Sequence, residues 1–131
     1  PISANFGCGS SREAAVYVLY DFGIRCVIAS SFGDIQYGNE LQNGMLPVIL
    51  PDAACATLRS QLHANPGATV AVDLEAQKVT GPDGAVYPFD IDANAKERLL
   101  KGLDDIGLVM QYSKDIEAFE QRHAAALPWL A

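Results

Sequence analysis

Two short apolar runs, each placed between helix-like segments, constrain the fold of this chain more than any other feature. The runs are RCVIAS at residues 25–30 and LPVIL at residues 46–50, and both are typical of buried strands. Pro47 is expected at the start of its strand or on an edge of the sheet, because proline cannot donate to a ladder. Because strands and helices alternate, the sequence predicts an α/β fold.

The first helix is expected at residues 10–22, and Gly23 is expected to end it. Apolar residues recur there at the three-and-four spacing of a helix with one buried face. The residues expected on that face are Ala15, Val18, Leu19 and Phe22.

Two further helical stretches are expected in the first half of the chain. The first covers residues 31–44, with breaks at Gly38 and Gly44. The second covers residues 51–67, with Asp52 as its N-cap and an Asn-Pro-Gly sequence as its end. Together with the two apolar runs, these stretches give the alternating pattern of an α/β domain.

The period of the sequence changes after residue 68. Residues 69–80 and 85–92 flank Gly-Pro-Asp-Gly, which predicts a hairpin or meander with its turn at Asp83-Gly84. The remaining third is expected to be helical, with breaks at Gly102 and Gly107. Its expected solvent-exposed acidic residues are Asp115, Glu117 and Glu120.

Composition argues against several classes of partner. The formal net charge is −7 and the nine Lys and Arg residues form no run, so the basic patch of a nucleic-acid-binding protein is not expected. No apolar run approaches the length that spans a membrane, and the first residues show no signal-peptide pattern. We therefore expect a soluble cytoplasmic protein with no nucleic-acid or membrane partner.

The cysteines and histidines do not predict a metal site in this chain. Cys8, Cys26 and Cys55 are odd in number and widely spaced, which argues against a disulfide framework and against zinc or iron–sulfur ligation. His63 and His123 lie in polar, helix-like contexts and are expected at the surface. We expect Cys8 to be a small packed residue and the other two cysteines to lie in the core.

The chemistry of the chain is expected in the glycine turn, NFGCGSSRE. Gly7 and Gly9 let a ligand approach the backbone closely, and the start of a helix offers unpaired N–H groups with partial positive charge. Arg12 adds a planar fork that suits a carboxylate or phosphate, and Ser10 and Ser11 add hydroxyl groups. The turn therefore predicts a site for a small anion, against the simpler alternative that a serine only caps the helix.

Three common motifs do not fit the glycine turn. A P-loop needs Gly-Lys-Ser/Thr, a dinucleotide fingerprint needs a third glycine, and a nucleophile elbow needs Gly-x-Ser-x-Gly. The turn contains none of these patterns. Neither histidine has an obvious route to Ser10, so Ser-His-Asp chemistry lacks support. An anion-binding turn with an unusual serine is what remains.

Four stretches of the sequence carry a resemblance to a known family. They are NFGCGSSRE, DFGIRCVIASSFGDIQYGNELQNGMLPVIL, VDLEAQKVTGPDG and LLKGLDDIGL. They resemble the small subunits of 3-isopropylmalate dehydratases, which are swivelling-domain components of the aconitase superfamily. The resemblance covers nearly the whole chain and implies one swivelling β/β/α domain over residues 1–131. It also implies that an N-terminal, strand-rich segment of this domain precedes the glycine turn and is absent from the sequence given.

The resemblance implies a hydro-lyase of leucine biosynthesis, which interconverts 2-isopropylmalate and 3-isopropylmalate by dehydration and rehydration. The active site would be shared with a large subunit that carries a 4Fe–4S cluster, and this chain would bind no cofactor itself. By the same resemblance, Ser10 falls on the catalytic base and Arg12 on the residue that binds a substrate carboxylate. Ser11 and Gly9 are implied as further substrate-binding residues.

Two alternatives stay open from the sequence. One is the small subunit of a related hydro-lyase that acts on citraconate or a methyl-substituted malate, because the loop that selects the substrate's side chain is not in this sequence. The other is a non-catalytic, anion-binding assembly module. Ala14 stands where the family most often has histidine, which leaves room for that module. The intact Ser10-Ser11-Arg12 favours the catalytic subunit.

Overall fold

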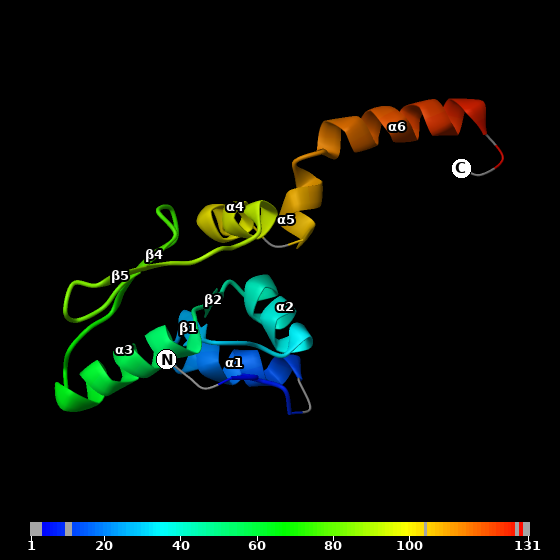
Figure 1. Ribbon diagram of the computed structural model, residues 1–131. Coiled ribbons are helices and arrows are strands. Elements are labelled where there is room, and N and C mark those ends of the chain that lie inside the picture. The colour runs from blue at the N-terminus through cyan, green and yellow to red at the C-terminus, as the bar shows by residue number, and fades with distance from the viewer. Residues whose placement is uncertain (1–3, 10–11, 104, 128, 130–131) are drawn as a thin grey trace.

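Helices and strands alternate through the first half of the chain, as the sequence predicts, and the α/β class is confirmed (Figure 1). The computed structural model describes residues 4–9, 12–103, 105–127 and 129. Within them the elements are α1 (Glu13–Asp21), β1 (Cys26–Ala29), α2 (Asp34–Gln42), β2 (Leu46–Ile49), α3 (Asp52–Ala64), β3 (Ala71–Asp73), β4 (Lys78–Thr80), β5 (Val86–Pro88), α4 (Ala93–Lys101), α5 (Asp105–Met110) and α6 (Ser113–Ala126).

Strands β1 and β2 form a parallel pair, and α2 makes the connection between them. In the register, Ile28 lies opposite Val48 and Val27 lies opposite Pro47. Because side chains alternate along a strand, Ile28 and Val48 face one side of the pair and Val27 faces the other. Pro47 lies on a strand that pairs on one side only within the described residues, which agrees with its expected edge position.

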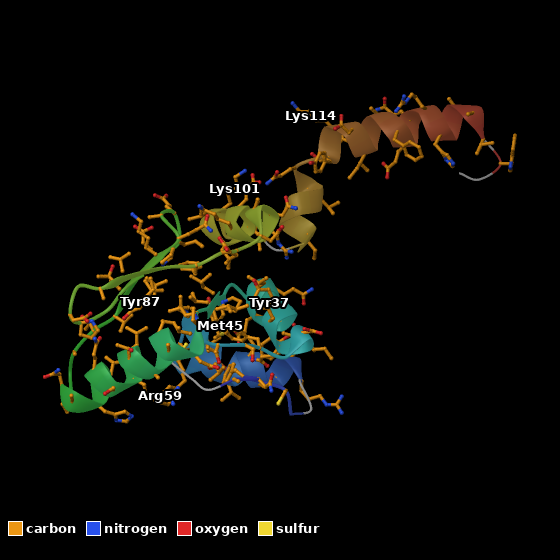
Figure 2. All side chains as sticks on the ribbon, viewed as in Figure 1. Tyr37, Met45, Arg59, Tyr87, Lys101 and Lys114 are labelled. Carbon is orange, nitrogen blue, oxygen red and sulfur yellow. The ribbon has the colours of Figure 1, made fainter. Side chains whose placement is uncertain are left out.

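Each face of this parallel pair carries its own apolar core. On one face, helix α3 and the β3–β5 region enclose a cluster of Leu46, Val48, Leu50, Ala54, Cys55, Leu58, Val79 and Phe89. On the opposite face, Val16 of α1 packs with Val27 and Met45. Met45 is fully buried in the interior (Figure 2). Helices on both faces therefore shield the parallel strands from water.

Strands β3, β4 and β5 form an antiparallel meander, which confirms the predicted change of period. The predicted turn is also confirmed: Gly84 has φ +81°, and Asp83 Oδ1 accepts a hydrogen bond from Ala85 N at 3.0 Å. The other oxygen, Asp83 Oδ2, accepts from Gln61 Nε2 of α3 at 2.6 Å. The hydrogen bonds from Ala85 and Gln61 lower the pKa of Asp83. Because Gln61 belongs to α3, the same carboxylate links the meander to that helix.

The buried face predicted for the first helix is confirmed at Leu19 and wrong at Ala15, Val18 and Phe22, which are exposed. Val16 is fully buried, whereas Val18 is 67% exposed and Phe22, just beyond the end of α1, is 85% exposed. The helix meets the parallel strands along Val16 and Leu19, which pack in the same cluster. A shift of one residue in helical register rotates the buried face by about 100°, and short apolar-rich helices do not specify that rotation. The predicted end is correct, since Gly23 has φ +94°.

Two of the predicted glycine breaks are wrong. Helix α2 continues through Gly38, and α5 continues through Gly107. A glycine inside a helix costs only about 1 kcal/mol relative to alanine, which the surrounding hydrogen bonds and packing offset. Gly44 and Gly102 do follow helix ends, and their φ values of +74° and +63° lie in the left-handed region.

The predicted N-cap of the third helix is also wrong. Asp52 is the first residue of α3, Pro51 occupies the N-cap position, and no side chain caps the helix. Asp52 still lies in the first turn, where its charge interacts favourably with the helix dipole. A side-chain cap is found at α4 instead, where Asp92 accepts hydrogen bonds from the backbone of Asn94 and Ala95.

The last helix, α6, extends away from the rest of the chain (Figure 1). None of its residues is buried, and the exposure predicted for Asp115, Glu117 and Glu120 is confirmed. His63 and His123 are exposed as well. No helix within the described ranges has the length and apolar character needed to cross a membrane.

The core around α3 gives a direct test of the fold. Leu58→Ala removes a fully buried side chain, so we expect a loss of about 2–5 kcal/mol in the free energy of unfolding. The matched change Leu100→Ala, at a position that is 48% exposed, should cost about 0.5 kcal/mol. Urea denaturation followed by circular dichroism measures both. Equal losses for the two variants would contradict the assignment of the core.

Candidate functional site

The glycine turn is attached by its backbone to the carboxyl end of β1. Phe6 forms a parallel bridge with Phe32, which follows β1 in the chain. Phe6 N donates to the carbonyl of Ser31 at 3.0 Å, and Gly33 N donates to the carbonyl of Phe6 at 2.9 Å. In parallel α/β sheets, ligands bind at the carboxyl ends of the strands. The turn is therefore held at the edge where a binding site is expected.

A second set of hydrogen bonds fixes the start of the turn. Asn5 N donates to Ser31 Oγ at 2.7 Å, and Ser31 Oγ donates to Asn5 Oδ1 at 3.2 Å. Asn5 adopts φ +57°, a conformation that asparagine tolerates better than most residues. Its carbonyl accepts from Cys8 N at 3.2 Å, which closes the turn. Ser31 lies in one of the stretches that carry the family resemblance, and these hydrogen bonds give that position a structural reason.

Two glycines allow the turn to pack directly on the first turn of α2. Gly7 has φ +73°, and a Cβ atom added there would lie 2.2 Å from Gln36 Cγ. A Cβ atom added at Gly33 would lie 3.2 Å from both Cys8 Cα and the carbonyl oxygen of Gly7. The missing side chain at Gly7 thus makes room for Gln36, and the approach of a ligand to this glycine stays a prediction. Gly9 is exposed and has open space around it.

Beneath the turn lies a buried polar pair that the sequence reasoning missed. Gln36 is 2% exposed and Glu40 is fully buried, and Gln36 Nε2 donates to Glu40 Oε1 at 2.8 Å. Glu40 Oε2 has no hydrogen-bond partner among the residues that the structure describes. Burial raises the pKa of Glu40, and the hydrogen bond from Gln36 acts in the opposite direction. Their four-residue spacing on α2 was the available signal, since it places both on one helix face.

Arg12 occupies the N-cap position of α1 with extended backbone, and its side chain is exposed. The neighbouring carboxylate is engaged elsewhere: Glu13 Oε1 accepts from Asn43 Nδ2 at 3.2 Å. Asn43 lies just after α2, and its Nδ2 also donates to the carbonyl of Asn39 at 2.9 Å. Within the described part of the chain, no carboxylate lies within ion-pair distance of Arg12. Its guanidinium is therefore available for an anionic ligand.

Gly9 and Arg12 are both exposed, Gly9 after the bridge at Phe6 and Arg12 at the N-cap of α1, and their roles in binding stay predictions. Ser10 and Ser11 lie outside the described residues, so their roles remain predictions. The expectation that Cys8 is packed is wrong, because Cys8 is exposed. Its backbone, and not its side chain, makes the close approach to Gly33.

A recess of about 380 Å³ lies beside the turn, at the carboxyl ends of β1 and β2. Ser31 and Phe32, which hold the turn, also line this recess. Tyr37 of α2 lines it as well, and burial together with the charge of Asp92 raises the pKa of this tyrosine. A larger cavity of about 650 Å³ lies away from the turn, between α1, the end of α2 and α4.

Three family models match consecutive parts of the chain. The model described as the aconitase C-terminal domain matches residues 2–53, which include the glycine turn. The model described as LeuD_N matches residues 56–93. The model for the C-terminal domain of the 3-isopropylmalate dehydratase small subunit matches residues 105–131. Together they span most of the chain.

Relatives match the chain along nearly its whole length. A protein of Phenylobacterium zucineum named 3-isopropylmalate dehydratase small subunit is 53% identical over 126 residues, which are 96% of this chain and 62% of the relative. The 3-isopropylmalate dehydratase small subunit 1 of Bordetella pertussis is 51% identical over 127 residues, which are 97% of this chain and 63% of the relative. The chain thus spans less than two thirds of the length of these relatives.

A solved structure shares the fold. The crystal structure of 3-isopropylmalate dehydratase from Methanocaldococcus jannaschii matches with a TM-score of 0.65 and 28% sequence identity. The match covers 90% of this chain and 65% of that chain. The mixed α/β fold of the aconitase type, expected from the resemblance, is confirmed.

The contact between the turn and α2 predicts different outcomes for two glycines. Gly7→Ala places a methyl group into Gln36 and forces alanine into a left-handed conformation, which by itself costs about 1–2 kcal/mol. Gly9→Ala meets open space and should change the free energy of unfolding by less than about 0.5 kcal/mol. Urea denaturation measures both, and equal stability of the two variants would argue against this packing.

The cysteines should differ in reactivity toward iodoacetamide. Burial, together with the charge of Glu40, raises the pKa of Cys26 to about 11, and burial raises that of Cys55. Because the ordinary pKa of a cysteine thiol is 9.0, Cys26 has about a hundredfold less thiolate at neutral pH than an unperturbed thiol. Exposed Cys8 should be alkylated first in the native protein, and Cys8→Ser should remove this fast phase. Mass spectrometry of tryptic peptides identifies the site, and fast labelling of Cys26 would contradict the prediction.

Proposed function

The chain belongs to the family of 3-isopropylmalate dehydratase small subunits, and from that premise we propose that it forms part of a hydro-lyase of leucine biosynthesis. The enzyme interconverts 2-isopropylmalate and 3-isopropylmalate. A hydroxyl group and a proton leave adjacent carbons as water, a carbon–carbon double bond forms, and water returns in the opposite orientation. Residues 1–131 belong to one swivelling domain, which acts in the cytoplasm with a large subunit.

One observation carries this proposal: exposed Arg12 occupies the N-cap of α1, shortly after a turn that Phe6 attaches to the carboxyl end of β1. The substrate has two carboxylates, and a planar guanidinium binds a carboxylate through two parallel hydrogen bonds. The neighbouring Glu13 accepts a hydrogen bond from Asn43, and Arg12 is exposed, which leaves its guanidinium accessible to a substrate. The first N–H groups of α1 add favourable partial charge for the same anion.

Ser10 is the proposed catalytic base, a role that the family resemblance supports. It follows Gly9 directly and precedes Arg12 by two residues. Removing a proton next to a carboxylate requires a base stronger than an ordinary serine hydroxyl. The start of the helix and the Arg12 guanidinium both favour negative charge, so they would stabilise the serine alkoxide. Ser11 and Gly9 help to hold the substrate.

The 4Fe–4S cluster of this enzyme belongs, in this proposal, to the large subunit. The cysteines of this chain have different surroundings: Cys8 is exposed, Cys26 is half-buried and Cys55 is buried. Within the described ranges, no three His, Cys, Asp or Glu side chains come together as metal ligands. These thiols do not fit a cluster's ligand set. The partner's cluster supplies Lewis-acid chemistry, while this chain binds and orients a carboxylate and moves a proton.

The proposal predicts distinct kinetic defects at two positions of the turn. In the full-length subunit assembled with its large subunit, Ser10→Ala should lower kcat for 2-isopropylmalate by about 10²–10⁴-fold, because a general base contributes that much. Arg12→Lys should raise KM by about 10- to 100-fold, since a hydrogen bond to a charged group contributes about 1.5–3 kcal/mol. Both variants should unfold near the wild-type urea midpoint.

Matched controls lie on the exposed side of α3. Ser60→Ala and Arg59→Lys make the same chemical changes away from the turn and should leave kcat and KM unchanged (Figure 2). A panel of 2-hydroxy diacids, including citramalate, separates an isopropylmalate enzyme from related hydro-lyases. Full turnover by Ser10→Ala would remove Ser10 from the mechanism. No turnover of any diacid by the assembled wild type would exclude a catalytic subunit.

A further inference from the structure

A buried polar pair lies between the glycine turn and the core, and the proposed mechanism does not use it. We propose that Gln36 and Glu40 position the glycine turn, and through it Arg12, for substrate binding. The proposal rests on the proposed function, in that it concerns the same site. Neither residue contacts the substrate; both act through the backbone of the turn.

The side chain of Gln36 lies directly against Gly7 of the turn. A Cβ atom added at Gly7 would lie 2.2, 2.6 and 2.8 Å from Gln36 Cγ, Cβ and Cδ. The backbone of the turn therefore rests directly on the body of this side chain. Because the interior is close-packed, a change in the Gln36 rotamer must move the turn.

A hydrogen bond to Glu40 fixes the rotamer of Gln36. Gln36 Nε2 donates to Glu40 Oε1 at 2.8 Å, one helical turn further along α2, and both residues are buried. Inside a protein such a bond is stronger than at the surface, and breaking it leaves a buried amide without an acceptor. Glu40 therefore holds Gln36 in the conformation that supports Gly7.

The Gln36–Glu40 pair is less stabilising than apolar residues would be at these positions, which favours a role in positioning the turn. Glu40 is fully buried, burial raises its pKa, and its Oε2 has no partner within the described residues. Buried carboxylates with incomplete hydrogen bonding are unfavourable relative to apolar residues of similar size. Two apolar side chains would fill this space at lower cost, but they would not fix one rotamer beneath Gly7.

Helix α2 also binds the chain on both sides of Arg12, at Phe6 and at Glu13. Gly33, at the start of α2, donates to the carbonyl of Phe6, and Asn43, at its end, donates to Glu13. Helices α1 and α2 also contact each other (Figure 1). Gln36 and Glu40 lie between these two attachment points. A displacement at Gly7 would therefore move the chain on the N-terminal side of Arg12, while the hydrogen bond from Asn43 holds Glu13 on its other side.

The test compares Glu40→Leu with Glu40→Gln in the full-length subunit assembled with its large subunit. Glu40→Leu removes the acceptor, so kcat/KM for 2-isopropylmalate should fall about tenfold, mainly through KM. Glu40→Gln keeps a carbonyl acceptor for Gln36 Nε2 and should retain wild-type kcat/KM. If Glu40→Leu does not fold, the double variant Gln36→Met/Glu40→Leu removes both partners together and should show the same fall. Val48→Ala destabilises the opposite core without contacting the turn, and should leave kcat/KM unchanged.

A second readout does not depend on turnover. Amide hydrogen exchange at Phe6 and Gly33 reports the hydrogen bonds that hold the turn, and exchange at Leu46 and Leu50 reports the sheet. Glu40→Leu should speed exchange at the first pair only, and Glu40→Gln should speed neither. Equal kcat/KM in the Leu and Gln variants, or unchanged exchange at Phe6 and Gly33, would overturn the positioning role. An inactive wild-type assembly would overturn the proposed function instead, while the exchange data would still decide whether this pair holds the turn.

Discussion

The backbone pairing of Phe6 with the segment after β1 is the interaction on which the site depends. Its two hydrogen bonds, to Ser31 and from Gly33, place the glycine turn at the carboxyl end of a parallel strand. The pairing needs no particular side chain, so it positions the turn by the register of the sheet. Phe6 and Phe32 then pack edge to face, with ring centroids 5.8 Å apart, against the core around Met45. The stability of that core thus contributes directly to the geometry of the turn.

Helix α2 has a larger part in this site than its sequence suggests. Besides connecting the two parallel strands, it receives the turn at Gly33, contacts it at Gln36 and binds Glu13 through Asn43. The last contact has an electrostatic consequence. A glutamate next to Arg12 could compete with an anionic ligand for the guanidinium, and Glu13 instead accepts a hydrogen bond from Asn43.

The sequence predicted those features that depend on local pattern. The two apolar runs became β1 and β2, the Asp83-Gly84 turn formed, and the glycine turn came before a helix that begins at Glu13. It did not predict which side of α1 is buried, because that rotation is set by the strands it meets. The Gln36–Glu40 pair was also missed, since a polar residue on a helix is ordinarily assigned to solvent and only packing reveals its burial.

The charge of the chain shows where the specificity of the turn must come from. With a formal net charge of −7, this chain by itself would repel the dianionic substrate proposed for it, so its own net charge offers no long-range attraction. Arg12 is exposed, and its attraction for an anion is screened within about 8 Å at physiological ionic strength. What remains is short-range geometry: the planar fork of Arg12 at the start of α1. In the proposed site, the contacts beneath Gly7 and at Asn43 would therefore contribute to binding, because they hold the chain on both sides of Arg12.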